Sequence, residues 1–102
     1  MQRKIRRKKV TICKIEITDP MGLHLRPAMV LCAEAQKYKA CVFIKVRNVE
    51  ANLKSVLNIL AAGVRMHDEI VLMCEGEDEE EALEALRSMI CPKLGREVAS
   101  DN

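Results

Sequence analysis

Apolar and polar residues alternate over four short stretches of the chain, which is the pattern of strands with one buried face. The first stretch covers residues 11–18 and places three apolar side chains on one side: Cys13, Ile15 and Ile17. Three further stretches show the same alternation: residues 41–47, 49–53 and 70–75. We therefore predict four strands, each of which contributes one apolar face to a common core.

Between and after these strands, apolar residues recur at spacings of three and four, which predicts amphipathic helices. The first helix covers residues 25–38, and the second is a short helix over residues 56–62 for which Ser55 is a suitable N-cap. A third helix follows the last strand. Asp78 and Glu81 have the spacing of a capping box at its start.

The predicted order is strand, helix, strand, strand, helix, strand, helix (βαββαβα). Strands with one apolar face and helices with one apolar stripe indicate an α+β fold, in which three helices cover one face of a four-stranded antiparallel sheet. We assign residues 11–92 to this domain. A basic extension, residues 1–10, precedes it, and residues 93–102 are expected to form a loose tail.

The face of the sheet away from the helices should meet water. By alternation, however, five apolar residues fall on it: Ile12, Cys41, Phe43, Val71 and Met73. A cover formed by the tails or by a second chain would explain them, and so would scattered exposed apolar residues, which are common. The pattern is therefore consistent with a monomer or a weak dimer.

The formal net charge of +2 hides a division of charge along the chain. The first ten residues hold six of the 17 Lys and Arg residues and none of the 15 Asp and Glu residues, so the rest of the chain is acidic. The basic segment suits a solvated arm, and alternatively contact with nucleic acid or an anionic surface. We expect no nucleic-acid partner, because one Tyr, one Phe and no Trp leave no aromatic platform for bases.

The chain has five cysteines and no Cys-x-x-Cys pair: Cys13, Cys32, Cys41, Cys74 and Cys91. An odd number without a secretion signal favours reduced thiols in the cytoplasm, packed as small hydrophobic residues. The cysteines and the two histidines lack metal-ligand spacing, so we expect no metal and no cofactor. No apolar run approaches the roughly 20 residues of a membrane span.

The stretch most indicative of chemistry is Gly22-Leu23-His24-Leu25-Arg26-Pro27-Ala28. His24 stands where a loop meets a helix N-terminus, whose first N–H groups lack helical partners and can bind an anion. Pro27 has no N–H, so the free donors are those of Leu25 and Arg26, and the Arg26 guanidinium can bind phosphate with two hydrogen bonds. An imidazole there could be a metal ligand, a general base or a nucleophile, or simply a surface residue at a helix cap. A nucleophile that takes up a phosphoryl group fits these donors best.

This stretch resembles the active-site signature of the HPr family, the histidine-containing phosphocarriers of the bacterial phosphoenolpyruvate:sugar phosphotransferase system. A second block, Asn52-Leu53-Lys54-Ser55-Val56-Leu57, is similar to the regulatory serine region of the Gram-positive type. The βαββαβα order is also that family's fold, an open-faced β-sandwich. The resemblance extends over residues 11–91 without an evident gap.

The resemblance implies a role for each matching residue. His24 would accept a phosphoryl group at Nδ1 from phosphorylated enzyme I and pass it to the IIA domain of a sugar permease. Arg26 would stabilise that group, with the first turn of the helix around it: Leu25, Arg26 and Pro27. Such a protein is a carrier and not an enzyme with its own turnover.

The resemblance also implies a docking surface and a regulatory site. The helix N-termini at Leu25 and Ser55 would lie side by side, with an apolar patch for both partners: Met29, Val56, Leu57 and Leu60. Ser55 would be the target of an HPr kinase/phosphorylase. Its phosphate would repel an acidic surface of enzyme I and slow the phosphorylation of His24. Ser55 as a plain N-cap needs no kinase, and that alternative stays open.

Some positions depart from the family pattern. Leu25 stands where a small residue or Thr is usual, Arg47-Asn48 replaces an Asn-Gly turn, and His67 matches no active residue and is expected to be exposed. Two alternatives to sugar transport stay open. One is a regulatory protein whose output is binding, and the other is a carrier of the nitrogen-related phosphotransferase branch, which shares the histidine motif.

Overall fold

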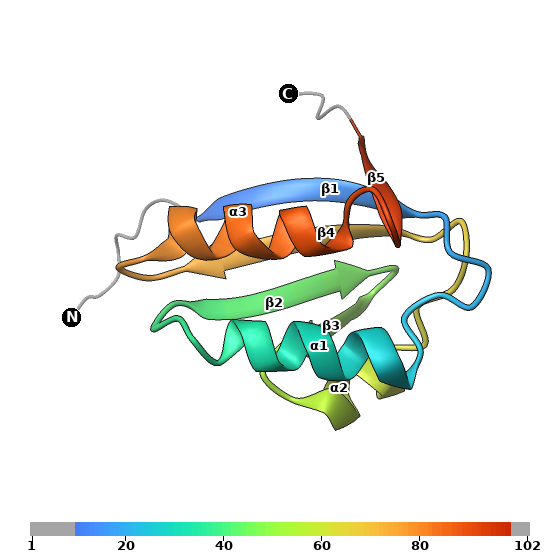
Figure 1. Ribbon diagram of the computed structural model, residues 1–102, viewed down its shortest axis with the longest axis horizontal. Helices are drawn as coiled ribbons and strands as arrows, with labels where there is room; N and C mark the ends of the chain where they lie inside the picture. Colours follow the sequence, from blue (N-terminus) through green and yellow to red (C-terminus); the bar gives the residue numbers. More distant parts are fainter. Residues whose placement is uncertain (1–9, 99–102) are drawn as a thin grey trace.

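The alternating stretches fold into one antiparallel sheet, and all three helices lie on the same side of it (Figure 1). The computed structural model describes residues 10–98. In chain order the elements are β1 (Thr11–Ile17), α1 (Leu25–Ala35), β2 (Cys41–Val46), β3 (Val49–Asn52), α2 (Val56–Ala61), β4 (Glu69–Glu75), α3 (Glu79–Ile90) and β5 (Gly95–Val98). The strands are arranged in the order β3-β2-β4-β1-β5.

The α+β architecture predicted from the pattern is confirmed, but the sheet has five strands and not four. The fifth strand, β5, falls in residues 93–102, which we expected to be a loose tail. It pairs antiparallel with β1, with Gly95 opposite Ile17 and Val98 opposite Lys14. Four residues, Gly-Arg-Glu-Val, are too short to show an alternating pattern. The basic extension, apart from Val10, lies outside the described residues.

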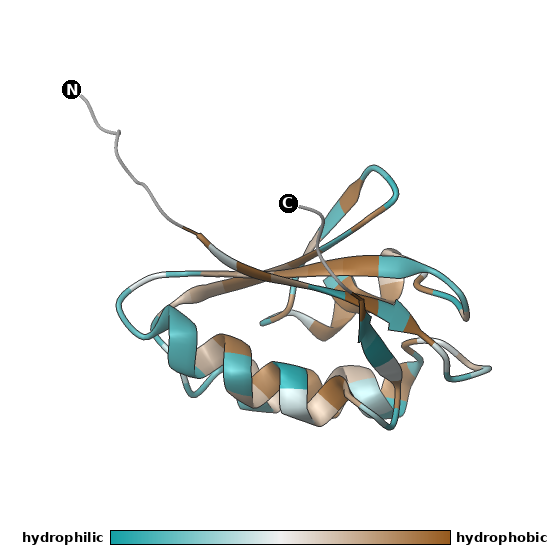
Figure 2. Ribbon diagram, turned by 90° about the horizontal axis from the view of Figure 1, so that it is seen from above, coloured by the Kyte–Doolittle hydropathy of each residue, from teal (hydrophilic) through white to brown (hydrophobic). Residues whose placement is uncertain are grey.

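The core lies between the helices and the inner face of the sheet, which form two layers (Figure 2). Strands β1, β2 and β4 bury every second side chain, and the helices bury the stripes predicted by their spacing: Ala28, Leu31 and Ala35 in α1, and Ala82, Leu86 and Ile90 in α3. All five cysteines are free. Burial raises the pKa of Cys13 to about 11 and that of Cys74 to about 12, so both thiols stay protonated at neutral pH.

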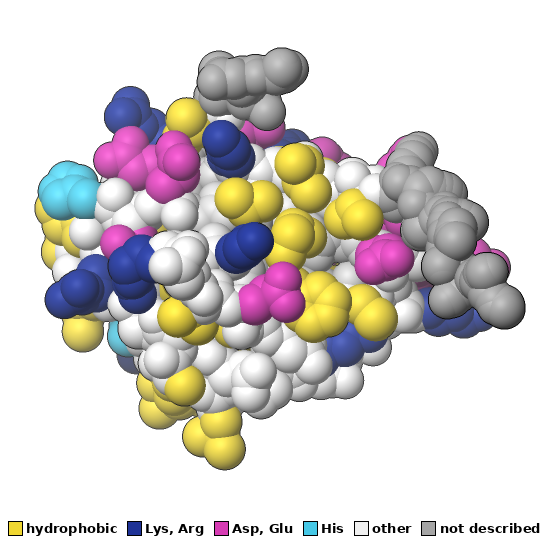
Figure 3. Space-filling model, turned by 180° about the vertical axis from the view of Figure 1, so that it is seen from behind, with side chains coloured by type: hydrophobic (Ala, Val, Ile, Leu, Met, Phe, Trp, Pro, Cys, Tyr) yellow, Lys and Arg dark blue, Asp and Glu magenta, His cyan; other side chains and the backbone are white. Residues whose placement is uncertain are grey.

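The outer face of the sheet carries the apolar row that alternation predicted. Strand register places Ile12 opposite Met73 and Met73 opposite Phe43, so the row crosses β1, β4 and β2. Apolar side chains gather on this face among Lys and acidic residues (Figure 3). Phe43 and Met73 are half-buried by their neighbours, while Ile12 and Cys41 are exposed.

Asp78 does not cap α3 in the way the capping box predicted, because its side chain makes no bond to that helix. Its carboxylate instead accepts hydrogen bonds from the backbone N–H groups of Lys39 (3.0 Å) and Ala40 (2.9 Å). The first of these bonds is the main reason why the pKa of Asp78 lies below its usual range. The carboxylate of Glu79 accepts a hydrogen bond from the N–H of Gly76 at 2.9 Å. Asp78 therefore joins the start of α3 to the segment that leads into β2.

The turn between β2 and β3, where Arg47-Asn48 stands, has a positive φ at Arg47 (55°). The Arg47 guanidinium donates to the Asp68 carboxylate and to the backbone carbonyls of Ala62 (2.9 Å) and Gly63 (3.2 Å). These carbonyls end α2 and have no helical partner, so the guanidinium completes that helix terminus. The bonds outweigh a backbone conformation that arginine rarely adopts.

Two loops meet closely at Gly22, just before α1. Gly22 has φ of +64°, and a Cβ atom there would lie 2.2 Å from the Val64 carbonyl oxygen. The N–H of the next residue, Leu23, donates to that same oxygen at 3.2 Å. Only glycine fits this approach, since any side chain would push the loop off the Val64 backbone.

Replacing Gly22 by alanine tests this contact, and Gly63→Ala is a matched control. Gly63 has nearly the same φ (+63°), but its nearest non-neighbouring atom lies 4.0 Å from the Cβ position. We expect Gly63→Ala to lower the free energy of unfolding by about 1–2 kcal/mol, the cost of the left-handed conformation alone. Gly22→Ala should lose clearly more, because the clash adds to that cost. Urea unfolding of both variants measures the difference, and equal losses would contradict the steric argument.

Candidate functional site

His24 is the N-cap of α1 and stands directly after the glycine contact. Its backbone is extended (φ −86°, ψ −172°), and its carbonyl accepts the first helical bond, from the N–H of Ala28, at 3.0 Å. The imidazole makes no capping hydrogen bond. Leu23 beside it is buried. The backbone is therefore held on both sides, while the ring is left available.

The first turn of α1 presents unused donors next to this ring. The N–H groups of Leu25 and Arg26 donate to no other described residue, and Pro27 has none. The Arg26 side chain is exposed and makes no ion pair within residues 10–98. A helix N-terminus carries partial positive charge, so this corner of the molecule suits an anion.

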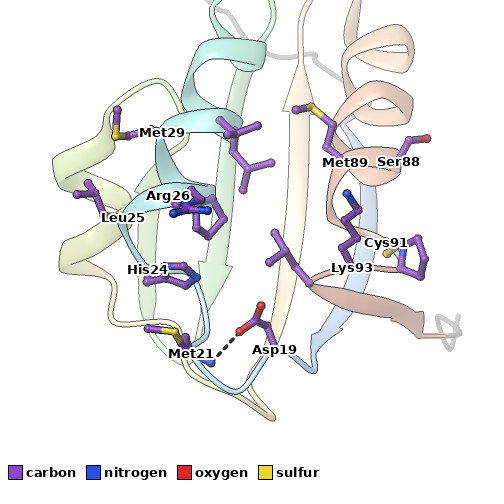
Figure 4. A pocket seen from close by; sticks show the side chains of 15 residues that line it. Asp19, Met21, His24, Leu25, Arg26, Met29, Ser88, Met89, Cys91 and Lys93 are labelled. Carbon is purple, nitrogen blue, oxygen red and sulfur yellow. Dashed lines mark hydrogen bonds between the residues drawn. The ribbon is translucent and has the colours of Figure 1, made fainter.

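His24 and Arg26 line a shallow open groove between α1 and the C-terminal end of α3 (Figure 4). Asp19 and Met21 close its lower end, where the Asp19 carboxylate accepts the N–H of Met21 at 2.8 Å. Residues from the end of α3 and the segment after it form the opposite side of the groove. Our sequence analysis assigned neither Asp19 nor the residues after α3 to the site. The hydrogen bond between the Asp19 side chain and an N–H two residues later is a recognisable local signal for the first of these.

Ser55 is the N-cap of α2, as predicted, and its Oγ accepts the N–H of Asn58 at 3.2 Å.

The expectation that the N-termini of α1 and α2 lie side by side is wrong. The residue before Ser55, Lys54, accepts a hydrogen bond from the Gln36 side chain at 2.9 Å, and its Nζ donates to the carbonyl of Tyr38 at 2.7 Å. Ser55 therefore lies beside the C-terminal end of α1, because the two helices run in opposite directions. The length of α1 puts about 16 Å between Ser55 and His24, at about 1.5 Å per residue.

An exposed apolar patch covers the neighbouring surfaces of α1 and α2, which contact each other. Met29, Leu57 and Leu60 are exposed members of it, and the Leu57 side chain is 78% exposed. Val56, which we also expected there, is half-buried and packs against the core. Leu25 is exposed beside Met29, and α2 passes next to both (Figure 4).

Other features lie away from the groove. His67 is exposed, as expected, and its Nδ1 lies 3.6 Å from the Glu16 carboxylate. Among residues 10–98, no group of three or more His, Cys, Asp or Glu side chains could hold a metal ion. Within the same residues, no helix has the length and apolar character needed to cross a membrane.

Comparisons with known proteins agree on one family. The family model described as "PTS HPr component phosphorylation site" matches residues 12–91. The chain is similar to phosphocarrier protein HPr of Mycoplasma pneumoniae, with 37% identity over 78 residues that cover 76% of this chain and 89% of that protein. It is also similar to HPr-like protein Crh of Bacillus subtilis, with 34% identity over 76% of this chain and 91% of that protein.

The solved structures lead to the same result. The solved structure of a mycoplasmal histidine-containing phosphocarrier protein superposes with a TM-score of 0.79 and 32% identity, covering 81% of this chain and 94% of that one. The family match includes both the His24 corner and the Ser55 block. The chain therefore belongs to the HPr family of the phosphotransferase system.

Proposed function

We propose that this protein accepts a phosphoryl group on His24 from phosphorylated enzyme I and passes it to IIA domains of sugar permeases. The observation that carries the proposal is the corner of α1, where an unbonded imidazole adjoins two free N–H groups and an unpaired arginine. Membership of the HPr family supports a phosphoryl group as the anion for this corner. The protein would act in the cytoplasm as a stoichiometric carrier and not as an enzyme with its own turnover.

The transfer requires an unprotonated ring nitrogen. Nδ1 of His24 attacks the phosphorus atom of the donor, a nitrogen–phosphorus bond forms, and the bond between phosphorus and the donor breaks with its electron pair left on the donor. In the second transfer, a nucleophile of the acceptor attacks the phosphorus atom. The nitrogen–phosphorus bond of His24 then breaks, and its electron pair returns to Nδ1. The phosphoryl oxygens would accept hydrogen bonds from the N–H groups of Leu25 and Arg26 and from the Arg26 guanidinium.

Both partners would dock on the apolar patch of α1 and α2. Met29, Leu57 and Leu60 are already exposed, so they can be buried without unfolding any part of the carrier. A small apolar centre bordered by charged residues suits an interface that forms and dissociates quickly. Fast exchange is what a carrier with two successive partners requires.

Ser55 phosphorylation would act on docking and not on the chemistry at His24. The Debye length at physiological ionic strength is about 8 Å, half of the separation of about 16 Å inferred from the length of α1. A phosphate on Ser55 would, however, stand next to Leu57 at the edge of the apolar patch. There its charge would repel an acidic partner surface.

A regulatory protein that works by binding is a second candidate, because one relative is the HPr-like protein Crh. The available imidazole of His24 and the unpaired Arg26 favour transfer in this chain. The phosphoryl donor of the nitrogen-related branch would bind at the same corner of α1. The sugar and nitrogen-related functions are therefore distinguished by which of the two donors phosphorylates His24.

Phosphoryl transfer from phosphoenolpyruvate is the direct test. With enzyme I and Mg²⁺, the chain should gain the mass of one phosphoryl group, the label should be lost in acid, and His24→Ala should gain none. An enzyme I that labels a known HPr serves as the positive control. If that enzyme is active and the wild-type chain stays unlabelled, the phosphocarrier proposal is wrong.

Arg26→Ala should slow the transfer about 10- to 100-fold, because a hydrogen bond to a charged group is worth about 1.5–3 kcal/mol. Lys37→Ala removes a cation from beyond the other end of α1 and should leave the rate unchanged. Rapid-quench measurement of the phosphohistidine provides both rates. A normal rate in Arg26→Ala would remove the guanidinium from the mechanism.

Ser55→Asp should raise the KM for phosphorylated enzyme I severalfold and leave kcat nearly unchanged, because the added charge lies far from His24. Asp is as good an N-cap as Ser, so α2 should keep its stability. Ser55→Ala, which adds no charge, is the matched control for kinetics. A fall in kcat with constant KM would contradict control through docking.

A further inference from the structure

The chain continues beyond the segment that matches the family, and this continuation forms one side of the His24 groove. The family match ends at residue 91. The next three residues, Pro92, Lys93 and Leu94, line the groove together with Met89 of α3. Arg26 lines it from the α1 side, and Lys93 from the opposite side (Figure 4).

Backbone hydrogen bonds hold this three-residue wall, Pro92–Leu94, in place. The N–H of Leu94 donates to the Ile90 carbonyl at 2.7 Å, and the Leu94 carbonyl accepts from Thr18 (2.9 Å) and Asp19 (3.2 Å). Asp19 belongs to the loop that leads to His24. The wall is therefore bonded both to α3 and to the loop that carries the candidate site.

Strand β5 anchors the wall from its other end. Gly95 packs so closely on β1 that a Cβ atom would lie 2.4 Å from the Glu16 carbonyl oxygen. Arg96 then pairs with the Glu16 carboxylate at 2.8 Å. Without this strand, the residues after α3 would have only the backbone bonds of Cys91 and Leu94 to fix them.

The groove has an apolar floor between two available cations. Pro27, Met89 and Leu94 contribute apolar surface, and Lys93 is exposed with no ion pair within the described residues. The one carboxylate in the lining, Asp19, is bonded to the N–H of Met21. A partner surface with an apolar side chain beside a carboxylate complements this arrangement.

We propose that the wall, and Lys93 in particular, is a second docking contact for the phosphoryl donor, where Lys93 pairs with an acidic side chain of the donor. The inference rests on the proposed function and extends it to a segment outside the family match. The contact continues the surface on which the donor must already lie to reach His24. The wall would thus help to select the donor and would take no part in the chemical step.

Lys93 also lies near the C-terminal end of α3, where a cation is favourable for the helix itself. Two of the last carbonyls of α3 already accept hydrogen bonds, that of Arg87 from the N–H of Cys91 at 2.8 Å and that of Ile90 from the N–H of Leu94 at 2.7 Å. A merely structural role would change the stability of the fold. A docking role changes KM and its dependence on salt.

The test compares Lys93→Glu with Lys39→Glu in steady-state phosphorylation by enzyme I. Lys39 is an exposed lysine beyond the far end of α1, where it pairs with Glu77. Both substitutions replace a lysine by a glutamate, so they change the net charge of the protein equally. We expect Lys93→Glu to raise the KM about three- to tenfold with kcat unchanged, an effect that shrinks as salt rises. Lys39→Glu should change neither constant by more than about twofold. Lys93→Arg should restore the wild-type KM.

The anchor is tested separately with Gly95→Val, which leaves Lys93 in place but forces β5 away from Glu16. Its KM should rise as in Lys93→Glu. If this variant does not fold, removal of residues 95–102 serves instead, since it deletes the anchor without a clash. Equal KM values in Lys93→Glu and Lys39→Glu, with a wild-type chain that is phosphorylated, would overturn the docking contact alone. A wild-type chain that is never phosphorylated would overturn the proposed function and the contact together.

Discussion

The contact between Gly22 and the Val64 backbone is the constraint on which the candidate site depends. It presses the loop before α1 against the segment after α2, where the Val64 carbonyl also accepts the N–H of Leu23. Arg47 holds the same segment from the side of the sheet through Asp68 and the last carbonyls of α2. His24 follows this contact directly. Its backbone is therefore fixed by bonds that do not involve its own side chain.

A second organising feature is the distribution of paired and unpaired cations. Arg47, Arg87 and Arg96 each have a carboxylate partner, whereas Arg26 and Lys93 have none among the described residues. Lys14, Lys45 and Arg65 also have no ion pair there. Because exposed ion pairs contribute little to stability, about 0–1 kcal/mol, leaving Arg26 and Lys93 unpaired costs the fold little. Both lie on the groove beside His24. Positive charge is thus available at the place where a phosphoryl group and an acidic partner would approach.

The elements themselves were largely predictable, because burial imposes a period of two on strands and of about 3.6 on helices. The end of α1 shows the limit of this periodicity. We predicted the helix to residue 38, but it ends at Ala35. The next residues form tighter turns, in which the N–H of Lys37 donates to the Glu34 carbonyl and that of Tyr38 to the Ala35 carbonyl. Strand β5 left no pattern in its four residues. Its place is decided by the free edge of β1 and by the absence of a side chain at Gly95.

The sequence by itself determined the make-up of the candidate site, because His24, Arg26 and the helix start are neighbours along the chain and need no tertiary contact to meet. It also determined the cap at Ser55, which depends on a residue only three positions away. Tertiary structure alone decided that α1 and α2 run in opposite directions, that Asp78 binds the segment before β2, and that Lys93 faces Arg26 across a groove. Each of these brings together residues that are remote in sequence. No local pattern encodes such a meeting, since it follows from how the whole chain buries its apolar surface.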